Sequence, residues 1–406
     1  MMNGCCRAVA VSCCRSWSDV VRNVTAASRR VATAQNHHAT SGPTRCVSRG
    51  LATSPHVHPG PGPEGPERTA PLRAVDLAKK IRREKKDAER AAKVTKTTTA
   101  TATATPLEKR VSELKQFTQQ LQNVHPNVLA KHLHKTMLFQ NKDVVVINKP
   151  YGVPVQDQRG GTCISSVLPI LVKMMDGAKS HWELQPCLGL EKEVTGTLLL
   201  ARSQEVVDHI VYLHRHNQLQ RKYWAVTVGV PVPSEGVIDI PLIEREVEGT
   251  QHHFKMGLSP MFRHNDTGEG VSRIRAHRQA ESAVTKYQVL DSRAGCSLVE
   301  LQPLTGVKHQ IRVHLASALG CPILGDHKYS CWSKLAPQKL PDNVLGKLGL
   351  EKSKTRNLPL HLHARQMILP GNDSQPEIRV SCPMPKYFTK ALQRLGLIFP
   401  DEKDVK

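Results

Sequence analysis

Residues 301–329 read LQPLTGVKHQIRVHLASALGCPILGDHKY and carry the most structural information in this chain. An apolar strand is predicted to end at Pro303, and Thr305 with Gly306 then turns the chain. The apolar spacing of residues 308–319 predicts a helix directly after this turn. A second turn, GCPILGD, leads on to residues 326–329.

Arg312 lies inside the predicted helix, between the apolar residues Ile311 and Val313. Its neighbours therefore predict that the guanidinium is partly buried. A buried guanidinium needs a carboxylate partner, because an unpaired buried charge is costly. The spacing alone does not say which acid this is, and Asp326 in the second turn is interpreted as structural.

The rest of the chain from about residue 137 mixes strand and helix signals without a regular alternation. Short apolar or β-branched runs predict strands, namely VVVINKP, TLLLAR, YWAVTVGV, AVTKYQVL and SLVELQPL. Between them, SSVLPILVKMMDG and EVVDHIVYLHRHN have helical spacing. This order predicts an α+β fold built around a largely antiparallel sheet with flanking helices.

Two further stretches place polar side chains at strand ends. In VVVINKPYGVPV (144–155), Pro150 and Gly152 fix a turn that holds Lys149 at the end of a strand. Taken alone, this is a turn with a solvated lysine. In RKYWAVTVGVPVP (221–233), two cations stand beside a tyrosine, which suits RNA, but the local pattern by itself favours a core tyrosine.

A third stretch, CLGLEKEVTGTLLLAR (187–202), has a polar loop in front of an apolar strand. The loop contains Glu191, followed by Thr195 and Gly196. From the local pattern, Glu191 is either a chemical group or a solvated loop acid.

Charge favours a polyanionic partner, because the 406-residue chain has a formal net charge of +22. The excess is not confined to the extensions, since the body that follows residue 106 is itself basic. The eleven cysteines form no CxxC pair, which argues against a zinc site and against a disulfide framework. No segment approaches the length of apolar residues that a membrane span needs.

The N-terminal part has a different composition. Residues 1–55 are rich in Arg, Ser, Ala and Thr and nearly free of acids, which is typical of a mitochondrial transit peptide. Residues 56–106 are predicted to be a disordered basic linker, although a charged helix over 77–93 is an alternative for part of it. Residues 107–137 are predicted to form an N-terminal helical segment.

Four ordered stretches together resemble the RluA-type pseudouridine synthase family: NKPYGVPV, VTGTLLLAR, RKYWAVTV and LTGVKHQIRVHLASALGCPILGDHKY. The resemblance covers residues 138–400, which it implies are the catalytic domain. It implies a pseudouridine-synthase fold with a curved sheet and a basic central cleft. It also implies that the chain isomerises uridine to pseudouridine in rRNA, tRNA or mRNA, with no cofactor and no metal.

The resemblance further implies roles for individual residues. Tyr223 matches the tyrosine that contacts the base, and Arg312 matches the basic partner of the catalytic carboxylate. The residues implied to bind RNA are Lys149, Arg221, Lys222, Lys308, His309 and Gln310.

The catalytic loop departs from the family pattern, which has His-Arg-Leu-Asp. The matching residues here are Leu188, Gly189, Leu190 and Glu191. A carboxylate is retained on a side chain longer by one methylene, and a misplacement of about 1 Å can cost about 100-fold in rate. Glu193 is a second acid in this loop, two residues out of register.

Two classes of function therefore remain open. The favoured one is an active RNA pseudouridine synthase of the mitochondrial matrix, with a nuclear or cytoplasmic pool left open. The alternative is a catalytically impaired RNA-binding or mitoribosome-assembly protein that keeps the fold. A glycosidase is disfavoured, because the motifs supply one carboxylate rather than a pair. Protein partners are left open.

Overall fold

The computed structural model describes residues 82–83, 104–157, 160–177, 182–247, 253–260, 262–264, 271–273, 277–371 and 376–400. The predicted transit peptide (1–55) and most of the predicted linker (56–106) lie outside the described residues. The elements below belong to one compact unit, Asp87–Lys406. Among the described helices, none has both the length and the apolar character that crossing a membrane would require.

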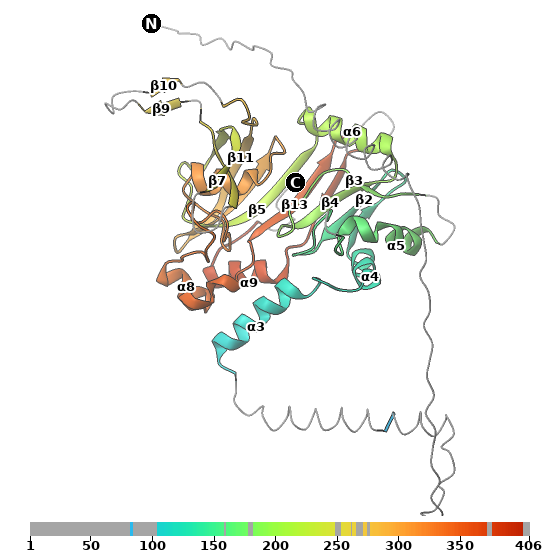
Figure 1. Cartoon of the computed structure of the whole chain (residues 1–406), viewed down its shortest axis with the longest axis horizontal. Coiled ribbons are helices and arrows are strands. Elements are labelled where there is room, and N and C mark those ends of the chain that lie inside the picture. The colour runs from blue at the N-terminus through green and yellow to red at the C-terminus, as the bar shows by residue number, and fades with distance from the viewer. Residues whose placement is uncertain are drawn as a thin grey trace, which may run out of the picture. The chain divides into compact units, whose positions relative to one another are not determined.

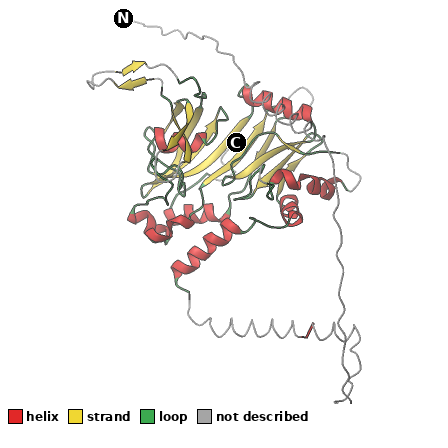
Figure 2. Ribbon diagram, in the orientation of Figure 1, coloured by secondary structure: helices red, strands yellow, loops and turns green. Residues whose placement is uncertain are grey.

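One ten-stranded sheet organises this unit (Figures 1 and 2). Its strands are β1 (Met137–Gln140), β2 (Val144–Lys149), β3 (Gln185–Pro186), β4 (Thr195–Ala201), β5 (Gln220–Val228), β6 (Glu235–Asp239), β11 (Val284–Arg293), β12 (Cys296–Pro303), β13 (Leu362–Leu369) and β14 (Ile378–Ser381). The order across the sheet is β1-β2-β4-β13-β5-β12-β11-β6, with β3 beside β4 and β14 beside β13. Among the described pairs, β4 with β13 is parallel and the others are antiparallel.

The remaining strands form two small hairpins. One pairs β7 (Leu242–Val247) with β8 (His253–Leu258), and the other pairs β9 (Phe262–His264) with β10 (Val271–Arg273). The helices are α3 (Pro106–Gln119), α4 (Pro126–Lys135), α5 (Ile164–Asp176), α6 (Gln204–Arg215), α7 (Gln310–Val313), α8 (Asp342–Leu348) and α9 (Lys386–Leu395), together with the π-helix η1 (His314–Ala318) and the 3₁₀ helix η2 (Lys352–Asn357).

Helices cover both faces of the strands β2 and β4 (Figure 1). Val145 and Ile147 pack in a cluster with α4 and α5, whereas their neighbours Val144 and Val146 pack in another cluster with α6. This alternation arises because successive side chains of a strand point to opposite faces. It explains why residues 144–147 of β2 and 198–201 of β4 are all apolar.

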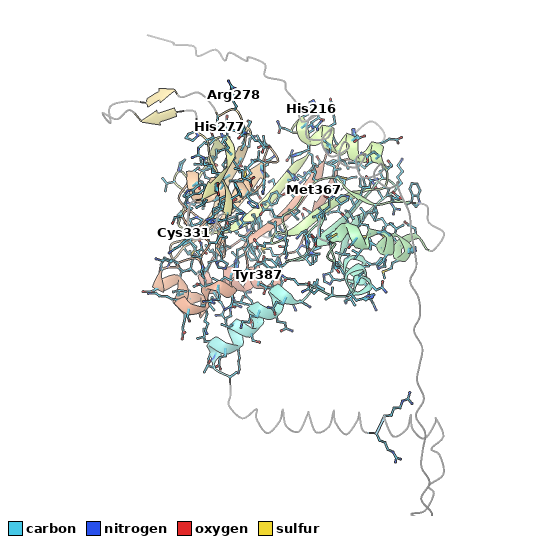
Figure 3. All side chains as sticks on the ribbon, viewed as in Figure 1. His216, His277, Arg278, Cys331, Met367 and Tyr387 are labelled. Atoms are coloured by element: carbon cyan, nitrogen blue, oxygen red, sulfur yellow. The ribbon has the colours of Figure 1, made fainter. Side chains whose placement is uncertain are left out.

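A second core lies where α3, α8 and α9 pack against β5 and β12. Tyr387 of α9, labelled in Figure 3, donates its hydroxyl hydrogen to the carbonyl of Leu360 at 3.0 Å. Its ring centroid lies 4.4 Å from that of Phe117 on α3. At the start of α3, Thr105 and Glu108 form a capping box that satisfies the free N–H groups of the helix terminus.

The predicted α+β class, the antiparallel character of the sheet and the flanking helices are therefore confirmed. The segment predicted as one helix over 308–319 differs in detail: α7 begins at Gln310 and continues as the π-helix η1 from His314 to Ala318. The strand β13 was not among the predicted strands, although it occupies the centre of the sheet between β4 and β5.

Candidate active site

Three carboxylates surround the guanidinium of Arg312, which is only 4% exposed. Asp326 accepts two hydrogen bonds from it, from Nε at 2.9 Å and from Nη2 at 2.8 Å. Nη1 donates to Oε2 of Glu191 at 2.7 Å, and Oε2 of Glu193 lies 3.5 Å from the same nitrogen. Two parallel bonds to Asp326 fix the plane of the guanidinium, so its third edge is aimed at Glu191.

Glu191 lies in the loop that joins β3 to β4, far in sequence from Arg312. Its Oε2 receives the hydrogen bond from Arg312, while Oε1 makes no hydrogen bond to any described residue. The side chain is 28% exposed. One carboxylate oxygen is thus held by the protein, and the other remains available to a reacting atom.

Burial and neighbouring charges shift the acids in opposite directions. Burial raises the pKa of Glu191; the charges of Asp326 and Glu193 act in the same direction, and Arg312 opposes them without cancelling the rise. Burial also acts to raise the pKa of Asp326, but its hydrogen bonds to Arg312 and to backbone N–H groups outweigh this and lower that pKa. Burial alone would lower the pKa of Arg312, whereas its carboxylate partners hold it well above the ordinary value.

Lys149 binds the backbone of the catalytic loop. Its ammonium group, which has no exposed surface, donates to the carbonyl oxygens of Pro150 at 3.1 Å, Lys192 at 2.9 Å and Val194 at 2.7 Å. Three donors meet three acceptors, so the hydrogen-bonding capacity of the ammonium is used completely. Burial lowers the pKa of Lys149 to about 7.

This position contradicts the solvated lysine that the local pattern predicted, whereas the predicted contact of Lys149 with RNA stays a prediction. A side chain without exposed surface cannot touch RNA unless the loop moves. Lys149 instead connects the end of β2 to Lys192 and Val194, one and three residues after Glu191.

The backbone of the same loop needs glycine just beyond Val194. Gly196 has a φ of +115°, and a Cβ there would lie 2.2 Å from the carbonyl oxygen of Ala364 on β13. The chain therefore passes β13 more closely than any side chain would permit. This close approach also brings the Thr195 hydroxyl within 2.8 Å of Nδ1 of His363.

Gln310, also predicted to contact RNA, is buried at the start of α7. It is 4% exposed, its Oε1 accepts from Thr305 and from the N–H of Val307, and its Nε2 donates to Val284 and Thr285. All four hydrogen-bonding positions of the amide are occupied within the protein. The side chain fixes the turn that precedes α7, and the predicted RNA contact of Gln310 stays a prediction.

Tyr223 and Lys222 point to opposite faces of the sheet. Tyr223 is buried in the cluster that contains Val194 and Ile311, the neighbours of the catalytic loop and of Arg312. Lys222 pairs with Glu300 at 2.8 Å, which places it on the other face. The predicted RNA contact of Lys222 therefore lies away from the face that carries Glu191.

Arg221 shares the face of Tyr223, because it lies two residues before it on β5. Its Nη2 is 3.3 Å from Nε2 of His214 on α6, and its Nε has no hydrogen-bond partner among the described residues. Lys308 is 58% exposed and pairs with Glu244 of β7. Both side chains remain candidates for RNA contact, and neither touches Glu191 in any contact the structure gives.

His309, which is predicted to contact RNA, lies beside the catalytic loop. Its Nε2 is 3.7 Å from Oε2 of Glu191, and its Nδ1 is 2.5 Å from the hydroxyl of Tyr329. Its backbone adopts a left-handed conformation with φ 56°, which is uncommon for residues other than glycine and recurs at functional sites. Nothing in the sequence pattern indicated this position.

A cavity of about 280 Å³ adjoins the catalytic loop. It is lined by residues 154–156 and 186–190 together with Lys192. Leu188 and Gly189, which stand where the family pattern has His and Arg, line it without a charged side chain. Within the described part of the chain, no three His, Cys, Asp or Glu side chains are grouped as a metal site would need.

The sequence and the fold are similar to those of known proteins. The family model described as RNA pseudouridylate synthase matches residues 143–317. A Danio rerio protein named "Pseudouridylate synthase RPUSD4, mitochondrial" is 55% identical over 337 residues, which are 82% of this chain and 91% of that protein.

The chain belongs to the RNA pseudouridylate synthase family. The Homo sapiens protein of the same name as the zebrafish relative is 50% identical and covers 82% of this chain and 86% of its own length. The solved structure of "Human RNA Pseudouridylate Synthase Domain Containing 4" has 51% sequence identity and a TM-score of 0.60, and the match covers 68% of this chain and 98% of the human one. A more distant Mus musculus relative, "Mitochondrial mRNA pseudouridine synthase Rpusd3", is 32% identical over 68% of this chain and 82% of its own.

These comparisons confirm the predicted RNA pseudouridylate synthase family and fold. The stretches GDHKYSCWSKLAPQKL and LPLHLHARQMILP resemble more narrowly the mitochondrial RNA pseudouridylate synthase domain-containing protein 4, and the comparisons confirm this likeness as well. They also confirm the predicted enzyme class, an RNA pseudouridine synthase, and its mitochondrial location. The roles of individual site residues and the predicted domain boundaries stay predictions.

Proposed function

We propose that this pseudouridine synthase isomerises uridine in mitochondrial ribosomal, transfer or messenger RNA, with Glu191 as its catalytic carboxylate and with Tyr223 and Arg312 as the other catalytic residues. The observation that supports Glu191 is its carboxylate, which Arg312 holds through one oxygen while the other oxygen stays open. The longer side chain is accommodated, since Arg312 reaches it at 2.7 Å.

The reaction moves a bond within one nucleotide. The C1′–N1 bond breaks, C1′ rejoins the base at C5, and the proton on C5 moves to solvent or to a base while N1 gains one. The open oxygen of Glu191 acts either on C1′ as nucleophile or on the ribose as base. Arg312 keeps this carboxylate oriented, which a reaction that tolerates little misplacement requires.

Tyr223 contacts the base rather than the ribose. Its ring is buried beside Val194 and Ile311, which holds it rigidly next to the catalytic loop. The uridine must leave its stack to reach this position, which costs a few kcal/mol in a duplex and less in a loop. Single-stranded or loop uridines are therefore the favoured substrates.

The test is a direct search for the product. The purified full chain is incubated with mitochondrial ribosomal, transfer and messenger RNA, and pseudouridine is mapped by carbodiimide labelling and primer extension. We expect modified uridines with the wild type and a rate lower by at least about 1,000-fold for Glu191→Gln. Glu205→Gln, an exposed acid on α6, is the matched control and should keep the wild-type rate.

A second arm addresses the altered loop. The combined variant Leu188→His, Gly189→Arg and Glu191→Asp restores the family pattern and should raise the rate above that of the wild type. If the wild type modifies none of the RNAs while this variant does, the natural chain is the impaired RNA-binding or mitoribosome-assembly protein of the alternative. Equal rates for the wild type and Glu191→Gln would remove Glu191 from the reaction.

A further inference from the structure

His309 lies at the junction between Glu191 and Tyr329, and its ring is only partly exposed. The side chain is 16% exposed, with Nε2 turned to within 3.7 Å of Oε2 of Glu191. This distance is too long for a hydrogen bond. It is short enough for an electrostatic interaction with the carboxylate, which is favourable if Nε2 carries a hydrogen and unfavourable if Nε2 carries a lone pair.

The hydrogen bond at the other ring nitrogen, Nδ1, decides whether Nε2 carries a hydrogen or a lone pair. Nδ1 lies 2.5 Å from the hydroxyl of Tyr329, and this hydroxyl also accepts the backbone N–H of Met256 on β8 at 3.3 Å. The amide of Met256 can only donate, so it occupies a lone pair of the hydroxyl oxygen. Among the described residues, His309 is then the one acceptor within reach of the hydroxyl hydrogen.

Tyr329 therefore donates to Nδ1, and a neutral imidazole whose Nδ1 accepts must carry its hydrogen on Nε2. The ring is neutral, because burial together with the cations Arg312, Lys328 and Lys308 lowers the pKa of His309 to about 3. A doubly protonated ring is thus disfavoured near neutral pH. The opposite tautomer would turn a lone pair toward the carboxylate of Glu191.

We propose that His309 is a positioning residue for Glu191: it presents Nε2–H to the carboxylate, and Tyr329 and the backbone of β8 fix its tautomer. The proposal rests on the proposed function, in which Glu191 is the catalytic carboxylate. Arg312 and His309 act on the same oxygen, Oε2, and leave Oε1 open. The backbone of the β7–β8 hairpin is thereby coupled to the reacting group through two side chains.

Other charged groups also face Glu191 and interact with its charge. They come from its own loop, from α7, from the turn after η1 and from the end of β2, and they are Glu193, Arg312, Asp326, Lys328 and Lys149. His309 differs from them because its effect depends on the position of one hydrogen. That hydrogen is controlled from outside the loop, by Tyr329.

Substitution at His309 separates this role from an RNA contact. His309→Leu should lower kcat by about 10-fold, because the carboxylate loses the N–H dipole that faces it, with KM and RNA affinity unchanged. Its acid limb in the pH profile should move to higher pH, because the ionised carboxylate loses support. His309→Gln can place an amide N–H near the position of Nε2–H and should restore both quantities toward wild type.

A direct measurement of the tautomer does not depend on activity. In the full chain labelled with ¹⁵N-histidine, the resonances that vanish in His309→Gln belong to His309, and their shifts should report hydrogen on Nε2. Tyr329→Phe should shift them toward the other tautomer and lower kcat, whereas Tyr287→Phe, which removes a buried hydroxyl bound to Pro233, should do neither.

Different outcomes would overturn the role of His309 and the proposed function. Hydrogen on Nδ1 in the wild type, or a wild-type kcat and pH profile for His309→Leu, would overturn the proposal. Weaker RNA binding by His309→Leu with unchanged kcat would restore the predicted RNA contact instead. Full activity of Glu191→Gln would overturn the proposed function, while the tautomer measurement would still report on the coupling between Tyr329 and His309.

Discussion

Nη1 of Arg312 lies 2.7 Å from Oε2 of Glu191, although 121 positions separate the two residues in the chain. The guanidinium is held from behind by Asp326, so the two acids have different roles at one cation. Asp326 is fully buried and bound through both oxygens, whereas Glu191 offers one oxygen to the outside. This difference supports the proposed roles, with Asp326 as a structural partner of Arg312 and Glu191 as the catalytic carboxylate.

Asp326→Asn should destabilise the protein by about 3–5 kcal/mol, because the buried guanidinium of Arg312 loses its buried bidentate partner and keeps only the partly exposed Glu191 and Glu193. The free energy of unfolding in urea measures this. Asp342→Asn is the matched control: its pair with Lys352 is exposed on both sides, and its loss should cost less than about 1 kcal/mol. Similar losses for both variants would mean that the bidentate pair is not a main support.

Glu193→Gln should extend the activity toward lower pH. Glu191 must be ionised to react, and its raised pKa means that activity falls on acidification at a higher pH than an ordinary glutamate would give. Glu193 is one of the like charges that raise this pKa, so its neutralisation lowers it. Single-turnover rates at saturating RNA between about pH 5 and pH 8 test the shift, and an acid limb that moves to higher pH would contradict it.

Lys149→Met should change how stability depends on pH. The pKa of Lys149 is about 7 in the folded protein and has its ordinary value near 10.4 in the unfolded chain. Between these values the unfolded state binds one more proton, so the free energy of unfolding attributable to this group rises with pH. Urea unfolding at about pH 7, 8 and 9 should show a flatter profile for the variant than for the wild type.

Tyr223→Phe should keep the fold and lose rate. The ring stays buried among its apolar neighbours, while the hydroxyl, which makes no hydrogen bond to a described residue, is removed. If this hydroxyl helps to move the C5 proton, the single-turnover rate falls by about 100-fold with little change in melting temperature. A wild-type rate would limit Tyr223 to stacking against the base.

Lys308→Ala should weaken RNA binding in a salt-dependent way. Lys308 is 58% exposed, so its ammonium can reach a phosphate in place of Glu244. Loss of one phosphate contact should reduce the slope of log K against log salt by about 0.7 for single-stranded RNA. Lys390→Ala, at a lysine that pairs with Glu113 on α3, is the control and should leave the slope unchanged if RNA lies on the face of Glu191.

The sequence by itself predicted much of this protein. Periodicity identified the apolar strands β2, β4, β5, β11 and β12 and the helices α5 and α6, because a strand or helix buried in a core keeps a simple apolar pattern. The position of Arg312 between two apolar residues also predicted a buried guanidinium with an acid partner. The resemblance of four ordered stretches supplied the family.

Only the tertiary structure decided which residues meet. The sequence predicts that the polar groups of Lys149, Lys222 and Gln310 contact solvent or RNA. In the structure, Lys149 binds backbone carbonyls, Lys222 binds Glu300, and Gln310 binds the turn before α7. The cause is physical: a side chain's environment depends on strands brought together from distant parts of the chain, which local pattern does not encode. The same holds for His309, since the position of its hydrogen depends on Tyr329 and, through it, on the backbone of β8.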